Sequence, residues 1–312
     1  MGLFNKKEVT ADKTRILNIP RVIQQLTPDF EDKDDCIIGE RAILNAIMLG
    51  DIAGSMGVRE RVKTDAIWND EALVYSNLSI LAKAIMDETM EIVFESQDIS
   101  LRKKYEAYSN ALKRAYKAND DLEFDEKFEL WAKDEMRPSE LLTYKSMDAT
   151  GAARALTIGT IAENIRDAVE LAVLSALPTN GHPEGIKGAA VCTSIVYMLS
   201  HGADKKEVVE LAKRFYKKKD KNAIPAGVLM ETLKNDKKIS KLPLAQVVVP
   251  EALSCFIDGH DYISTVKNAL SFEGDNSLIA AIAGAFAVAY YGETLLNDTK
   301  ILSQYIDIST MR

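Results

Sequence analysis

Residues 277–291 read SLIAAIAGAFAVAYY, and none of these side chains carries a charge. A helix of a globular protein that is apolar on every face is covered by other helices on every side. The alanines and Gly284 have little side-chain volume, so neighbouring helices can approach closely. This stretch therefore predicts a central, buried helix in an all-α fold.

A second stretch, residues 185–199, has a similar pattern, with small residues first and larger apolar residues later. Pro183 and Pro250 are each followed by glutamate. We expect each proline at the first position of a helix, where proline loses no hydrogen bond and the acid faces the positive helix end. The helix after Pro183 should run to about Ser200, and the helix after Pro250 should end near Gly259.

Helical periodicity extends over much of the remaining chain, including residues 41–50, 71–96 and 101–117. A run of β-branched residues at 247–249 is too short to found a sheet. We therefore predict a single all-α globular domain of roughly ten or more helices over residues 41–312.

Residues 1–40 differ from the rest and predict an N-terminal arm. They are mixed polar, contain Pro20 and Pro28, and include an acidic run at residues 29–35. Such a segment is laid on the domain or is partly mobile. The acidic run lacks the glycine and the spacing of a calcium-binding loop, so we interpret it as a solvated loop.

The composition narrows the classes of function. Of the 312 residues, 47% are apolar and 28% are charged, which is typical of a globular protein. No apolar run approaches the ~20 residues of a membrane span, and three cysteines without CxxC spacing suit a reducing compartment. The net charge of -8 disfavours nucleic-acid binding. We therefore expect a cytoplasmic protein with no nucleic-acid or membrane partner.

Four glycine-containing segments follow one another along the chain: GDIAGS at 50–55, GAAR at 151–154, GHPEGIKGA at 181–189 and GDNSLIAAIAG at 274–284. In this order and spacing they resemble the ADP-ribosylglycohydrolase family, which includes the dinitrogenase reductase-activating glycohydrolases. The VPEAL segment at 249–253 also has a counterpart there. The likeness covers residues 41–292, and its third and fourth segments are the specific ones.

The resemblance implies a multi-helix fold with a cleft that binds ADP-ribose. In active members the cleft holds two Mg²⁺ ions, which help to cleave the N- or O-glycosidic bond between ADP-ribose and a modified side chain. Mg²⁺ takes oxygen ligands in near-octahedral order, and two close cations need several carboxylates. Active relatives supply them from a Thr-Asp-Asp-Thr run that opens an early helix and an Asp-x-Asp-Thr run that opens the late small-residue helix.

This chain departs from that ligand set. In the late run Asp275 remains, but Ser277 stands at the second aspartate position and Leu278 at the threonine position. The early run falls at Trp68-Asn69-Asp70-Glu71, which keeps one aspartate and adds a glutamate. The resemblance thus leaves at most one Mg²⁺. The candidate catalytic residues are Asp70 and Glu71, and the residual metal ligands are Asp70, Asp275 and Ser277.

Further family positions also differ. A glutamate expected four residues after the second glycine of GDxxG is Val58 here, with Glu60 two residues further on. A loop that usually reads Gly-Asn-Gly-Ser is Asp148-Ala149-Thr150-Gly151, and a His-Asn pair is replaced by Asn180-Gly181. The scaffold segments therefore match, whereas several chemical residues do not.

Residues in the matching segments are candidates for holding the ligand. His182 either contacts a phosphate or ribose or satisfies backbone groups at a helix start. Arg154 either lies near the ligand or anchors a loop through a buried ion pair. Asp51 either supports the cleft by hydrogen bonds or is simply a turn residue. Glycines permit tight turns and let backbone N–H groups meet a diphosphate. The candidate set is Asp51, Gly151, Arg154, Gly181, His182 and Gly185.

The leading hypothesis is an ADP-ribosylglycohydrolase-like protein with a degraded metal site. It would be a weak enzyme or none, and would bind ADP-ribose, an ADP-ribosylated protein or another protein partner. One alternative is an active hydrolase that removes ADP-ribose from modified side chains with one Mg²⁺ on Asp70, Glu71 and Asp275. Another is an immunity or inhibitor protein whose residues 1–40 plug the active site of a partner. A purely structural use of the fold ranks last.

Overall fold

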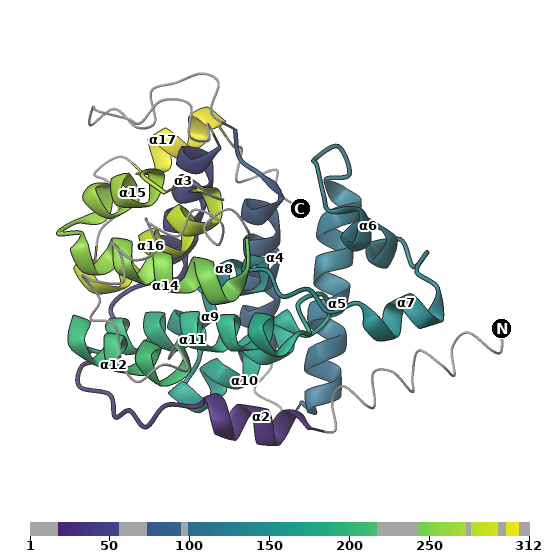
Figure 1. The fold of residues 1–312 in the computed structure, drawn as a ribbon, viewed down its shortest axis with the longest axis horizontal. Coiled ribbons are helices and arrows are strands. Elements are labelled where there is room, and N and C mark those ends of the chain that lie inside the picture. The colour runs from purple at the N-terminus through teal and green to yellow at the C-terminus, as the bar shows by residue number, and fades with distance from the viewer. Residues whose placement is uncertain are drawn as a thin grey trace.

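The computed structural model describes residues 18–55, 74–94, 99–216, 243–272, 276–292 and 298–305. Helices build this described part, and its β-structure is limited to one isolated bridge between Asp148 and Leu244. The predicted all-α globular domain is confirmed (Figure 1). The helices are α2 (Ile19–Leu26), α3 (Glu40–Gly54), α4 (Asn77–Phe94), α5 (Leu101–Ala118), α6 (Glu126–Ala132), α7 (Pro138–Thr143), α8 (Thr150–Arg154), α9 (Ile158–Ile161), α10 (Ile165–Ala176), α11 (Pro183–Ser200), α12 (Lys205–Phe215), α14 (Ala245–Asp258), α15 (Tyr262–Leu270), α16 (Asn276–Tyr291) and α17 (Asp298–Tyr305).

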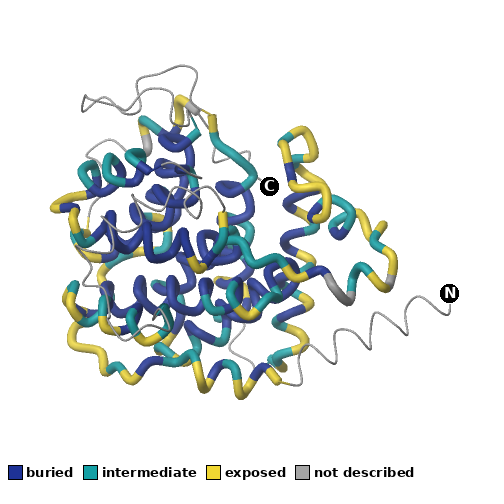
Figure 2. Tube along the Cα trace, in the orientation of Figure 1, coloured by how far each residue is buried: buried dark blue, intermediate teal, exposed yellow. Residues whose placement is uncertain are grey.

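Helix α16 lies at the centre of the fold, as its all-round apolar sequence predicts. All its residues are buried except Ser277, Tyr290 and Tyr291. Helices α3, α11, α14 and α15 pack around it, and Figure 2 shows the buried residues gathered in this main body. Helix α11 spans Pro183–Ser200 and is the second buried helix, as expected. Helices α16 and α11 therefore form the buried centre against which the surrounding helices pack.

Helices α3 and α16 touch through their backbones. A Cβ added to Gly50 would lie 2.5 Å from the backbone nitrogen of Ala281, and one added to Gly54 would meet the backbone of Ser277. These glycines therefore permit the close approach of the two backbones. Both lie inside α3 rather than in a tight turn.

The expectation for Pro250 is wrong. Helix α14 begins at Ala245, so Pro250 lies inside the helix rather than at its first position. The preceding valines, Val247 to Val249, are at most 4% exposed. Their burial against neighbouring helices overrides the preference of β-branched residues for strands. Because proline has no N–H, the helix lacks the usual hydrogen bond from residue 250 to the carbonyl of Gln246. The helix ends at Asp258, beside the expected Gly259.

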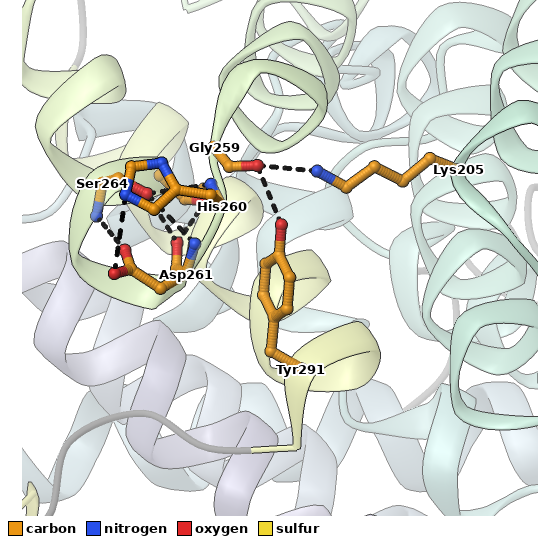
Figure 3. Close-up of polar contacts among 7 residues, drawn as sticks. Lys205, Gly259, His260, Asp261, Ser264 and Tyr291 are labelled. Atoms are coloured by element: carbon orange, nitrogen blue, oxygen red, sulfur yellow. Dashed lines mark hydrogen bonds and ion pairs between the residues drawn. The ribbon is translucent and has the colours of Figure 1, made fainter.

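Lys205 of α12 closes the end of α14 (Figure 3). Its Nζ donates to the carbonyl oxygens of Phe256, Ile257 and Gly259 at 3.0, 3.1 and 2.7 Å. The Tyr291 hydroxyl donates to the same Gly259 oxygen at 2.8 Å. The last carbonyls of a helix have no hydrogen-bond donor within the helix, and the helix end carries partial negative charge. The ammonium group of Lys205 satisfies both needs.

We expect Lys205→Met to lower the free energy of unfolding by about 2 kcal/mol, because three carbonyls lose a charged donor. Urea denaturation followed by circular dichroism measures the change. The matched control is Lys206→Met, since Lys206 is the exposed next residue of the same helix. Equal losses in the two variants would contradict the capping role of Lys205.

The described part of the N-terminal arm, residues 18–40, lies on the domain. Helix α2 packs against α10 and α11. Further along, the Tyr197 hydroxyl donates to Asp32 at 2.8 Å, and the backbone N–H of Lys33 donates to the carbonyl of His201 at 3.1 Å. The acidic run is therefore partly docked rather than only solvated. Its binding to another protein stays a prediction.

Candidate functional site

A cavity of about 640 Å³ lies between the main body and the group formed by α6 and α7. Small-molecule and cofactor pockets typically have volumes of about 300–1,000 Å³. One wall comes from the first turns of α4, with Asn77 and Leu81, and the opposite wall from α6 and α7. The floor comes from the segment at 144–150, from α8 and from the connection between α10 and α11. In Figure 1 the group of α5, α6 and α7 stands beside the main body.

Arg154 lines this cavity although it is only 1% exposed. Its Nη2 donates to Thr179 Oγ1 at 2.6 Å and to the Ser175 carbonyl at 3.3 Å. Its Nε has no hydrogen-bond partner in the described part of the chain. Burial lowers the pKa of Arg154 to about 10, an effect that the charge of Asp148 opposes. Within the described ranges no carboxylate forms an ion pair with Arg154, so the buried ion pair we considered is replaced by neutral oxygen partners.

A chain of hydrogen bonds continues from Arg154 across the floor. Thr179 Oγ1 donates to Asn180 Oδ1 at 2.8 Å, and Asn180 Nδ2 donates to Asp148 Oδ1 at 2.7 Å. Asn180 and Asp148 both stand at positions where the sequence departs from the family pattern. The structure brings these two departures into direct contact, so they form one polar unit.

The glycines of the sequence motifs surround this unit. A Cβ added to Gly151 would lie 2.9 Å from the side chain of Asn180, and one added to Gly185 would lie 2.7 Å from its carbonyl oxygen. A Cβ on Gly181 would lie 3.1 Å from the carbonyl oxygen of Leu177. These glycines therefore make room for Asn180 and for the backbone around it. Their contact with a diphosphate stays a prediction.

His182 serves the backbone at the start of α11. It is the N-cap residue, and its Nδ1 accepts a hydrogen bond from the Glu184 N–H at 3.1 Å. This is the local role that we considered for it. His182, Gly181 and Gly185 lie outside the lining of the cavity, whereas Arg154 is part of it. Contact between His182 and a ligand stays a prediction.

Asp51 is fully buried within α3 and is not a turn residue. Its Oδ2 accepts from the Ser76 N–H at 2.8 Å and from Ser79 Oγ at 2.6 Å, and its Oδ1 accepts from Ser76 Oγ at 2.8 Å. Burial raises the pKa of Asp51, and these hydrogen bonds oppose that shift. Asp51 thereby fixes the start of α4, which forms a wall of the cavity.

The expected metal positions are only partly described. Asp70, Glu71 and Asp275 lie outside the described residues. Ser277 Oγ donates to the backbone oxygen of Asp51 at 3.0 Å, and Leu278 is only 3% exposed. Among the described residues no group of three or more His, Cys, Asp or Glu side chains is arranged to hold a metal ion. The donors in this part of the chain do not fit two Mg²⁺ ions.

Sequence reasoning missed several residues of the site. Asp148 and Asn180 were identified only as departures from the family pattern. Ser146, Thr150 and Thr179 were not predicted as site residues. The wall formed by α6 and α7 carries no motif. The one available signal was that the departures at 148 and 180 each come shortly before a segment that holds candidate ligand-binding residues.

Comparison with known proteins agrees with this architecture. A family model described as ADP-ribosylglycohydrolase matches residues 71–303. A solved structure described as an "ADP-ribosylglycohydrolase-related protein complex" is 16% identical, with a TM-score of 0.56 over 85% of this chain and 94% of that one. At this identity the likeness shows the fold alone. No curated protein matches the chain. None of the described helices is long and apolar enough to cross a membrane.

Proposed function

Because the chain belongs to the ADP-ribosylglycohydrolase family, we propose that its cavity binds ADP-ribose, free or attached to a protein, and that hydrolysis is weak or lost. The observation that carries this proposal is the start of α16, where active relatives place metal ligands. The Ser277 hydroxyl carries no negative charge and donates to the backbone oxygen of Asp51, and Leu278, which has no ligand atom, is packed into the core.

The chemistry of Mg²⁺ supports the same conclusion. Two close Mg²⁺ ions need several carboxylates to offset their charge. At the α16 position a neutral hydroxyl offers one weak oxygen, and leucine offers none. If Asp70, Glu71 and Asp275 hold a single ion, that ion supplies charge stabilisation and an oriented water. The proposed binding of ADP-ribose rests on the described lining of the cavity, which comes from other segments.

Calorimetric titration of ADP-ribose with and without Mg²⁺ tests the proposal. We expect binding with the same Kd in both conditions, and no release of ADP-ribose from ADP-ribosylated arginine or serine peptides. Binding that requires Mg²⁺, together with release of ADP-ribose, would identify an active hydrolase instead. If ADP-ribose does not bind in either condition, the ligand proposal is wrong and a protein-binding role takes its place.

A further inference from the structure

The floor of the cavity presents a half-buried carboxylate, that of Asp148. Its Oδ1 accepts hydrogen bonds from the Thr150 N–H at 2.9 Å, from Thr150 Oγ1 and from Asn180 Nδ2 at 2.7 Å. Its Oδ2 accepts from Ser146 Oγ. A carboxylate has about four acceptor positions. Since Ser146 occupies one position on Oδ2, that oxygen can accept from a further donor.

The positive charge of Arg154 lies behind this layer. Arg154, Thr179 and Asn180 are at most 2% exposed, whereas Asp148, Ser146 and Thr150 are half-buried. A ligand that reaches the floor therefore meets an acceptor and two hydroxyl groups before it meets the guanidinium. Such a surface suits a ligand group that donates hydrogen bonds.

A phosphate fits this floor poorly. The Thr150 N–H, at the start of α8, already donates to Asp148, so the chain's own anion occupies that place. A phosphate set against it would bring two negative charges together. Lys127 and Lys145 also line the cavity, and both are exposed. They offer cationic groups on the solvent side of a lining that also contains the carboxylates of Asp125, Glu126 and Glu140.

The geometry points to Asp148 as a specificity-determining residue that accepts a hydroxyl of the terminal ribose at the cavity floor, while the diphosphate stays near Lys127 and Lys145. Carboxylates recognise ribose hydroxyls in the same way in dinucleotide-binding proteins. This inference rests on the proposed function, because it names the end of ADP-ribose that the floor recognises. Ser146 and Thr150 hold the carboxylate in place for that contact.

Calorimetry of the full chain with three probes tests the inference: ADP-ribose, ribose 5-phosphate and ADP, which lacks the terminal ribose. We expect Asp148→Asn to weaken binding of the first two about tenfold and to leave ADP binding unchanged or tighter. The control is Asp204→Asn, which makes the same charge change at the start of α12, outside the described cavity lining, and keeps a residue that caps the helix. It should leave all three affinities within about twofold.

The outcomes separate the inference from the proposed function. Tighter ADP-ribose binding by Asp148→Asn would place the diphosphate beside residue 148 and overturn the inference. Equal effects of the two variants would overturn it as well. Binding of ribose 5-phosphate without ADP-ribose, with the same loss in Asp148→Asn, would keep the inference and reject the proposed function. If neither sugar probe binds, both are wrong.

A fold defect is detected separately. Melting curves of each variant report any loss of stability. Ser146→Ala keeps the charge of Asp148 and removes the hydroxyl that donates to its Oδ2. It should weaken both sugar probes a few-fold and leave ADP binding unchanged. Loss of affinity for all three probes, ADP included, would contradict recognition of the terminal ribose at the cavity floor.

Discussion

Replacing Gly50 by alanine should lower the free energy of unfolding by about 3 kcal/mol or more. The added Cβ would lie 2.5 Å from the nitrogen of Ala281 and 2.6 Å from the carbonyl carbon and oxygen of Ala280. All three are backbone atoms of the central helix, so no flexible side chain can move aside. The clash also has to exceed the gain of about 1 kcal/mol that alanine brings to a helix interior.

Urea denaturation followed by circular dichroism measures this loss, with Gly39→Ala as the matched control. Gly39 precedes the same helix, and a Cβ there would meet nothing within 4 Å. The control should cost less than about 1 kcal/mol, the usual effect at an N-cap. If the two alanine variants unfold at the same urea concentration, close contact between α3 and α16 is not what requires Gly50.

The second large effect concerns Glu251, and it depends on pH. Glu251 follows Pro250 inside α14 and is 1% exposed. Neither carboxylate oxygen has a hydrogen-bond partner in the described part of the chain. Burial raises the pKa of Glu251 from 4.5 to about 8. Between these two values the folded chain therefore keeps a proton that the unfolded chain has released.

This difference fixes the direction of the pH effect. Since the folded state binds the extra proton, stability falls as pH rises from about 4.5 to about 8. The contribution from Glu251 is at most about 1.4 kcal/mol for each pH unit. We expect Glu251→Gln to remove this contribution, because glutamine keeps the shape and cannot ionise. The variant should be close to the parent at pH 5 and more stable by a few kcal/mol at pH 8.

Urea denaturation at pH 5, 6, 7 and 8 measures the two slopes. The control is Glu91→Gln, which changes an exposed glutamate of α4 and should keep the parent's slope. A parent and a Glu251→Gln variant with parallel pH profiles would show that Glu251 ionises equally in the folded and unfolded states. That result would contradict the conclusion that the Glu251 carboxyl is buried without a hydrogen-bond partner.

The central part of the fold could be predicted because residues 277–291 are apolar on all faces and residues 185–199 carry only one charged side chain, that of Lys187. Such helices can only be internal, so their place follows without any long-range information. Pro250 shows where this reasoning fails. Its position depends on how tightly the preceding valines pack against other helices, and local signals for a helix start carry no information about that packing.

The candidate site was less accessible from the sequence. Arg154 belongs to a matching segment and was named in advance, and it does line the cavity. Asp148 and Asn180 are 32 positions apart, and nothing local indicates that they share a hydrogen bond. The wall at α6 and α7 is defined by where helices dock, not by a motif. The metal positions at 70, 71 and 275 lie outside the described residues, so those expectations stand as predictions.

The hydrogen bond between Ser277 and Asp51 also bears on what a carboxylate at position 277 would change. The serine hydroxyl donates to a backbone oxygen across the close contact between α3 and α16. An ionised aspartate in its place has no proton to donate and would set two acceptors against each other. Replacing Ser277 by aspartate would therefore remove a donor to the Asp51 oxygen as well as add a carboxylate. The contact between α3 and α16 thus links the charge at the start of α16 to the packing of the central helix.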